Sequence, residues 1–509
     1  MAGVQFNYIP GSGLVAPMFT FEVNSGGQYQ QLDRFVLIGH KTSAGTMALD
    51  TPTPVASQQM VDAFAGPGSQ LREMYRIAAQ NAPAAPFWIL AIDDSALTAA
   101  IWTLTIAAFT GTGVATCQIA GETIQVAVGA ADTPTTIAAA LVAAINAYYN
   151  PLTGAMLPIT AAAAAGVLTV TARNKGAMFN ETDFYVPTNI QGNIFAQTGV
   201  WTLAVGTAGA GTPTGVAAAL AVLGDDPADY VVSPWSDATS LSAYTAFGSD
   251  ISGRWAWSRQ SYGHCWCASV GTFSALTTLG LTMNDRHTTI IGCIAPGANG
   301  TPHGSWLWVS GIAARLSPWL SDTTTGNVSR NQTGLVVAGL APPRDPSVRP
   351  NFTARNTLLS SGISTWNAQP GGVVTVDKII TTYRTGVSGQ PDSVFRDVQA
   401  MYQLAGGLKF MRASLANDHG QKALAAANPA NLPAISTPAD IQASFIHYYS
   451  QLTRRGVFAD PATFANLLVV QINEQNPNRV DCFVPLERVA PLDIMAANAT
   501  VYQAFPQAA

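Results

Sequence analysis

Histidine and cysteine side chains gather in one stretch of the sequence, where they could bind a soft metal or supply a thiol nucleophile. His264 directly precedes a Cys-Trp-Cys segment at Cys265 and Cys267, and His287 and Cys293 follow. Thiolate and imidazole are common zinc ligands, and a thiolate beside a base is a nucleophile. The Cys-x-Cys spacing is, however, shorter than that of a zinc knuckle. We expect buried residues of a sheet here, with a Cys-dependent site in an α/β enzyme as the alternative.

Carboxylates are the second group that could do chemistry, as general acids or bases. Asp93, Asp94, Asp225, Asp226 and Asp229 all lie beside expected strand ends, where aspartate commonly caps turns and helices. No lysine follows a glycine, which excludes a Walker-type phosphate loop, and no serine lies in a Gly-x-Ser-x-Gly motif. We therefore expect a chain that is not an enzyme and has no catalytic residues, metal site or cofactor.

The composition favours a protein whose surface is largely covered by other subunits. Charged residues make up 10% of the 509 residues, against about 25% in a typical soluble domain. The basic residues are 19 arginines and only 5 lysines. Arginine is enriched at protein interfaces, whereas lysine is depleted there. A neutral surface rich in Thr, Ser, Asn and Gln on an ordinary enzyme is the alternative explanation.

The net charge and the apolar pattern argue against two classes of protein. A formal net charge of −5 is unlike that of a globally basic nucleic-acid-binding protein. The first basic residue is Arg34, so we expect no secretory signal, and no uninterrupted run of 18 apolar residues occurs. We expect a chain that is made in a cytoplasm, inserts into no membrane and binds no nucleic acid.

The elements that must position these residues begin with an α/β pattern. Short apolar runs at Phe35–Gly39 and Phe87–Ile92 suit buried parallel strands. Between them, Ser57–Phe64 and Ser69–Asn81 are typical of helices, the second with a serine N-cap. Residues 1–30 look instead like an extended arm with one short strand, which has no partner of its own.

Residues 96–222 have a different composition, dominated by Ala, Thr, Gly and Val. Alternation of apolar and polar residues predicts strands at Trp102–Ile106, Thr123–Val128 and Val167–Ala172. One helix is expected after Pro134. We interpret this segment as an inserted β-rich domain with a single helix.

The C-terminal half returns to the α/β pattern and ends in longer helices. The expected strands are Asp229–Ser233, Cys265–Val270 and Thr288–Ile294, then a pair at Val373–Val376 and Ile379–Tyr383, and finally Val480–Val484. The expected helices are 392–416 and 438–451. Apolar residues from Val394 to Leu415 recur every three or four positions, which predicts one buried face on the first of these helices.

A set of short segments occurs in a recognisable order along the chain. The segments are Tyr230-Val231-Val232-Ser233-Pro234-Trp235, Arg355-Asn356-Thr357-Leu358-Leu359, Gly362-Ile363-Ser364-Thr365, Ile380-Thr381-Thr382-Tyr383-Arg384, Phe395-Arg396-Asp397-Val398 and Asn476-Pro477-Asn478-Arg479-Val480. With the Ala/Thr-rich insertion, this ordered set resembles the contractile-tail sheath proteins of the Mu-like bacteriophage group. The resemblance extends over most of the chain and is strongest in its C-terminal half.

The resemblance implies an α/β (α+β) multi-domain fold. It combines a conserved α/β sheath core, an inserted β-rich outer domain, and extended N- and C-terminal arms that add strands to a neighbour's sheet. The expected divisions are an arm at 1–30, core at 31–95, the insertion at 96–222, an α/β sheath domain at 223–350, a tube-facing C-terminal domain at 351–488 and an arm at 489–509.

The resemblance also implies a structural function. Sheath proteins of this family stack as hexameric rings around an inner tail tube and contract to drive the tube through the host envelope. The implied partners are other copies of the chain, the tail tube protein, and baseplate and tail terminator or neck proteins in a virion. The sheath of a pyocin-like or related contractile injection particle is the alternative.

Three groups of residues are expected to make these contacts. The arm strands would use Phe19, Phe21, Val23, Val501 and Phe505, the tube would be contacted by Lys409 and Arg412, and Cys117 and Cys482 are candidates for an intersubunit disulfide. The cysteine pair is suggested because five cysteines cannot all pair within one chain. Cys265 and Cys267 are expected to be buried, since they alternate on a central strand.

Overall fold

A central eight-stranded sheet organises the part of the chain that the computed structural model describes, residues 33–501 and 503. In chain order its strands are β1 (Phe35–His40), β2 (Thr53–Val55), β3 (Phe87–Ile92), β11 (Tyr230–Val232), β12 (His264–Val270), β13 (Thr288–Cys293), β14 (Ile363–Gln369) and β15 (Val373–Lys378). The order across the sheet is β15-β14-β13-β12-β11-β1-β3-β2. The six inner strands are parallel, and only β2 and β15 at the edges are antiparallel to their neighbours. The predicted parallel strands β1 and β3 are therefore confirmed.

Helices cover both faces of this sheet, which explains the continuous apolar runs of its strands. In β1, Phe35 and Leu37 face one apolar cluster, and Val36 and Ile38 face the other. The first cluster includes α2 (Gln70–Asn81) and α7 (Ser305–Leu320). The second includes α4 (Val216–Ala221), α5 (Ala238–Gly248), α6 (Phe273–Thr282) and α8 (Phe352–Ser360). A further helix, α1 (Gln58–Ala65), packs against α2.

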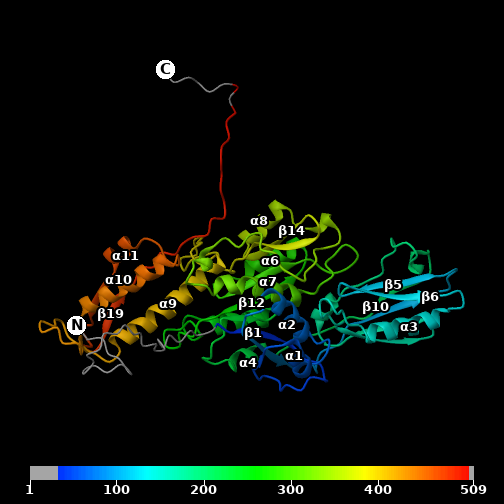
Figure 1. Cartoon of the computed structure of the whole chain (residues 1–509), viewed down its shortest axis with the longest axis horizontal. Helices are drawn as coiled ribbons and strands as arrows, with labels where there is room; N and C mark the ends of the chain where they lie inside the picture. Colours follow the sequence, from blue (N-terminus) through cyan, green and yellow to red (C-terminus); the bar gives the residue numbers. More distant parts are fainter. Residues whose placement is uncertain (1–32, 502, 504–509) are drawn as a thin grey trace, which may run out of the picture. The chain divides into compact units, whose positions relative to one another are not determined.

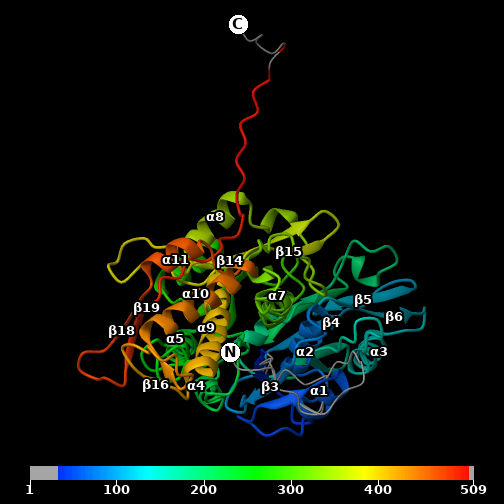
Figure 2. The ribbon, with the colours of Figure 1, turned by 60° about the vertical axis from the view of Figure 1, so that its left-hand side comes forward.

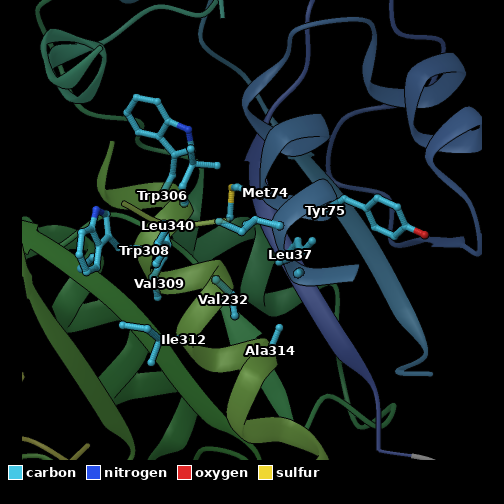
Figure 3. Close-up of a cluster of buried hydrophobic side chains, with 14 of the residues drawn as sticks. Leu37, Met74, Tyr75, Val232, Trp306, Trp308, Val309, Ile312, Ala314 and Leu340 are labelled. Atoms are coloured by element: carbon cyan, nitrogen blue, oxygen red, sulfur yellow. The ribbon is translucent and has the colours of Figure 1, made fainter. Parts of the chain in front are cut away.

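The helices α2 and α7 pack against each other in the core. Figure 3 shows Trp306, Val309 and Ile312 of α7 in the same buried cluster as Met74 of α2 and Leu37 of β1. The predicted N-cap of α2 is also present, because the Ser69 side chain accepts a hydrogen bond from the Arg72 backbone N–H.

The segment that follows β3 folds into two smaller sheets and one helix. Its elements are β4 (Ile101–Ile106), β5 (Gly113–Ile119), β6 (Glu122–Val128), α3 (Pro134–Asn146), β7 (Ile159–Ala164), β8 (Val167–Ala172), β9 (Phe184–Tyr185) and β10 (Trp201–Thr207), with short 3₁₀ turns at Ala177–Glu181 and Ile194–Ala196. The sheets have the orders β10-β4-β8-β7 and β6-β5-β9, and α3 packs against β6, β7 and β8 (Figure 1). The three strands and the helix predicted here are confirmed.

Polar contacts join this β-rich segment to the rest of the molecule. Arg344 forms an ion pair with the buried Asp183 at 2.5 Å, and Glu181 accepts a hydrogen bond from the Ser305 backbone N–H at 2.8 Å. Apolar side chains of both regions belong to one continuous cluster. The domain divisions drawn from the sequence stay predictions. The helix α4, inside the expected insertion, packs on α5 and β3.

The C-terminal region is built from three helices and two small sheets. The elements are α9 (Val398–His419), β16 (Ala423–Leu424), β17 (Ile435–Ser436), α10 (Pro438–Arg454), α11 (Pro461–Leu467), β18 (Val469–Ile472) and β19 (Val480–Phe483). The helix α10 packs against α9, α11 and β18 (Figure 2). None of the helices in the described ranges has both the length and the apolar character needed to cross a membrane.

Two sequence expectations in this half are wrong. The strand Val373–Lys378 pairs with the preceding strand Ile363–Gln369, because Gly371 and Gly372 adopt positive φ and close a tight hairpin. Residues 379–383 therefore form no strand and make only an isolated bridge at Ile380.

The predicted start of the long helix α9 is also wrong, because it lies before the observed start. It starts at Val398 rather than residue 392, and Val394, expected on its buried stripe, is exposed before the helix begins. The Asp392 carboxylate instead accepts hydrogen bonds from the Tyr383 hydroxyl and the Val394 backbone N–H, which fixes a turn.

Candidate subunit-interaction site

The hairpin β18–β19 is a two-stranded sheet whose outer edges are unpaired. Val469 lies opposite Phe483 and Ile472 opposite Val480, and no other described strand joins either edge. No residue of β18 carries a charge, although charged side chains commonly protect a sheet edge from pairing with another chain. The hairpin thus offers backbone N–H and C=O groups for the addition of a further strand.

Apolar side chains are exposed around this hairpin. Phe483 is 63% exposed, and Leu467 at the end of α11 and Val469 in β18 are each about half exposed. An isolated two-stranded hairpin is marginally stable, and α10 supports this one from one side. The combination of open edges and exposed apolar side chains makes the β18–β19 hairpin our candidate site for binding another protein chain.

The C-terminal tail has no regular secondary structure between Val489 and Val501, and the addition of its strand to a neighbour's sheet stays a prediction. Its last hydrogen bonds and ion pairs with other described residues are made at Leu492 and Asp493. Val501, predicted as an arm contact, is 94% exposed, so it makes little contact within the described part of its own chain. The other predicted arm residues lie outside the described residues: Phe19, Phe21, Val23 and Phe505.

The two candidates for tube contact have different surroundings. Lys409 of α9 forms an ion pair with Asp229, next to β11, and a second with Asp33 at 3.7 Å. Arg412, one turn further along α9, is exposed and forms no ion pair with a described residue. Lys409 therefore forms ion pairs within its own chain. Of these two candidates, only Arg412 is an exposed residue without an ion pair to a described residue.

The cluster around Lys409 combines two carboxylates and one ammonium group. Burial and the nearby charge of Asp229 raise the pKa of Asp33 to about 6, while Lys409 opposes this rise. Burial lowers the pKa of Lys409, but the charges of Asp229 and Asp33 raise it overall. The ammonium group therefore stays charged, and the cluster ties α9 to the segment that enters β1.

The cysteine and histidine residues at the central sheet do not form a common site. Cys265 and Cys267 face one apolar cluster, and Cys293 faces the other, across the sheet. Burial raises the pKa values of all three thiols, so the reactive thiolate is disfavoured. Within the described ranges, no group of three or more potential ligands is placed to hold a metal ion.

His264 is a core residue that hydrogen-bonds within the sheet. Its Nε2 lies 2.8 Å from the Thr289 hydroxyl, and burial lowers its pKa to about 3. The expectation that Cys265 and Cys267 are buried is confirmed.

The structure separates the two candidates for an intersubunit disulfide. Cys117 lies in β5 and is fully buried, and burial raises the pKa of its thiol to about 12, so the expected exposure of Cys117 is wrong. Cys117 shares one face of β5 with Ala115 and Ile119, and all three side chains are buried in the apolar cluster. Cys482 in β19 is exposed and lies next to Phe483.

The paired aspartates serve as caps and ion-pair partners. Asp93 accepts hydrogen bonds from the backbone N–H and hydroxyl of Ser95, and Asp225 forms an ion pair with Arg259 at 2.6 Å. These arrangements explain the aspartates without an acid–base role. Sequence reasoning missed the strand β18, although the apolar run Leu467–Val470 before a polar turn was a signal for it.

Comparison with known proteins gives one clear relative. No family model matches the sequence. Over 496 residues the chain is 28% identical to the protein named "Mu-like prophage FluMu tail sheath protein" from Haemophilus influenzae, which covers 94% of this chain and 95% of that protein. The resemblance drawn from the ordered segments is confirmed by this match over nearly the whole chain.

Two solved structures are also similar. The sheath tail protein from Desulfitobacterium hafniense aligns with a TM-score of 0.49 and 11% identity, over 93% of this chain and 97% of that one. The sheath tail protein from Listeria innocua aligns with a TM-score of 0.47 and 12% identity, over 90% and 92% of the two chains.

Proposed function

We propose that this chain is the sheath subunit of a phage-like tail, and that it polymerises around an inner tube. The observation that carries the proposal is the end-to-end similarity to the Haemophilus influenzae relative, at 28% identity. The low content of charged residues supports it, because a subunit in a polymer has less surface in contact with water. The partners would be other copies of the chain and a tail tube protein.

The β18–β19 hairpin is the part of the subunit that we assign to polymerisation. Its open edges accept a strand, and backbone hydrogen bonds then link two subunits with little dependence on side-chain sequence. The exposed apolar residues beside it, including Phe483, become buried in the same contact. The C-terminal tail of a neighbouring copy is the strand that we propose to bind there.

A contact of this kind is heterologous, since a tail on one subunit meets a hairpin on the next. Heterologous contacts close into rings or continue as an open helix, according to the rotation between subunits. We propose stacked hexameric rings that form a helical tube. Contraction is then a rigid-body rearrangement of subunits that stay joined through these strands, in a virion tail.

Electron microscopy of the purified chain tests the proposal directly. Tubes or rings of regular diameter are expected for the full chain above a threshold concentration. A variant ending at Asp493 should remain folded, with an unchanged far-UV circular dichroism spectrum, but should not polymerise. Monodisperse monomers of the full chain at every concentration would contradict the proposed function, and tubes from the shortened chain would contradict the role of the tail.

A further inference from the structure

A cluster of four charged side chains joins the C-terminal tail to the start of α9. Asp397, the N-cap residue of α9, is almost completely buried. Its carboxylate forms ion pairs with Lys378 of β15 and with Arg488, each at 3.0 Å. The Lys378 ammonium group also lies 2.5 Å from a carboxylate oxygen of Asp493 in the tail. Lys378 thus links a buried carboxylate to a carboxylate of the tail.

Three neutral hydrogen bonds support the same stretch of the tail. The backbone N–H of Val489 donates to the Val457 carbonyl at 3.2 Å, and the Val489 carbonyl accepts from the Gln403 side chain at 2.8 Å. The Leu492 carbonyl accepts a hydrogen bond from the Asn331 side chain at 2.7 Å. Each partner comes from a different part of the fold, so the tail is held at several points between 488 and 493.

Contacts of this kind stop at Asp493. Among the described residues, no hydrogen bond or ion pair joins residues 494–501 to another part of the chain. Ile494 is 84% exposed and Met495 is 85% exposed, and both are apolar. Among the described residues, the tail therefore changes at Asp493 from a segment held by hydrogen bonds and ion pairs to one that makes neither.

Cations pair with both carboxylates of the cluster, which favours a fixed arrangement. Burial alone would raise the pKa of Asp397, but the charges of Lys378 and Arg488 lower it overall. Lys378 and Arg488, with Arg396 at 3.9 Å, thus pair with Asp397, and Lys378 also pairs with Asp493. Removal of a buried partner leaves an unpaired charge, whereas removal of Asp493, which is more exposed, leaves Asp397 with all of its cations.

We propose that the Lys378–Asp397–Arg488–Asp493 cluster fastens the tail to its own subunit and sets the point from which it reaches a second copy of this chain. The exchanging segment then begins at Ile494, five residues after the boundary expected from the sequence. An extended segment from 494 to 501 spans up to about 26 Å, at roughly 3.3 Å per residue. The identity of the partner rests on the proposed function. The fastening of the tail to its own subunit does not depend on that function.

Hydrogen exchange of the isolated full-length chain tests the fastening. Asp493→Asn removes the tail carboxylate, and we expect the backbone amide of Val489 to exchange about fivefold faster, as for loss of a partly exposed ion pair. Asp493→Glu keeps the charge and should restore slow exchange. Asp132→Asn, the same change of charge in the β-rich segment, should leave Val489 unaffected.

The threshold concentration for polymerisation tests the positioning role in the same variants. Asp493→Asn should raise it several-fold, because a loosened tail spends less time directed toward a neighbour. Unchanged exchange at Val489 would overturn the fastening, whatever polymerisation does. Faster exchange with an unchanged threshold would overturn the positioning role. If the unmodified chain never polymerises, the proposed function fails, while the exchange data still decide the fastening.

Discussion

The central sheet and the β18–β19 hairpin are both made of paired strands, but they differ in what covers them. Every residue of β13 is buried, as are the first five residues of β12. No residue of β18 or β19 is buried, and their outer edges have no partner strand within the described ranges. The core sheet has helices on both faces, whereas the hairpin is supported mainly by α10.

This difference separates folding from association. The core buries its apolar surface and pairs its backbone groups within one subunit, so its free energy stabilises the monomer. The hairpin leaves backbone groups and apolar side chains unpaired, so part of its free energy is released only when another chain binds. We therefore expect changes in the core to reduce stability, and changes in the hairpin to reduce polymerisation with little effect on stability.

The largest expected effect is the loss of a buried tryptophan from the core. Trp366 in β14 is 2% exposed, donates a hydrogen bond to the Gly292 carbonyl at 3.0 Å and packs on Trp308. Trp366→Ala should lower the free energy of opening the core by about 3–5 kcal/mol, measured by hydrogen exchange of amides in β12 and β13. The control is Trp257→Ala, at a position 83% exposed, which should change this value by less than about 0.5 kcal/mol.

A smaller effect on the core comes from acid. Burial lowers the pKa of His264 from 6.5 to about 3, so between these values the unfolded chain binds a proton that the folded chain does not. Stability therefore falls as the pH falls below about 6, by about 1.4 kcal/mol per pH unit from this residue. His264→Gln should remove that part of the slope.

The matched control for this pH dependence lies in the C-terminal region. His447 is exposed on α10, so His447→Gln makes the same change of side chain outside the buried core. Measurements of core opening between pH 6 and pH 4 compare the three chains. Equal slopes in the unmodified chain and in His264→Gln would contradict the assignment of a neutral, buried imidazole.

Changes in the hairpin should separate association from stability. Phe483→Asp places a charge on an exposed apolar position, so the free energy of core opening should change by less than about 0.5 kcal/mol. Polymerisation should be lost, because the charge would be buried in the contact between subunits. Leu152→Asp, at an apolar position in the β-rich segment that is 94% exposed, is the control and should still polymerise.

The same contrast explains which features could be predicted from the sequence. The strands β1 and β3 were predictable because burial on both faces produces nearly continuous apolar runs. The start of α9 was not, because Val394 fits a helical stripe although Asp392 fixes a turn there. Local periodicity carries no information on such a turn.

Contacts between segments distant in the sequence could not be predicted from the sequence either. Lys409 was expected to contact the tube, yet its partner Asp229 is 180 residues away in the sequence, and its partner Asp33 comes from the other side of the insertion. The same holds for Lys378 and Asp493, which are separated by 115 residues. A single sequence shows neither pair, since an ion pair leaves no periodic pattern.

The smallest expected effect is a difference in thiol reactivity between the central sheet and the β18–β19 hairpin. Cys482 in the hairpin is exposed, whereas the four other cysteines are buried, so a maleimide should modify one thiol per folded chain and five after denaturation. Cys482→Ser should abolish the reaction of the folded chain. If β19 lies in the contact between subunits, polymerised protein should react more slowly than monomer, and any disulfide between subunits after oxidation should form through Cys482 and not Cys117. Rapid modification of a second thiol in the folded monomer would show that the core opens more readily than its packing indicates.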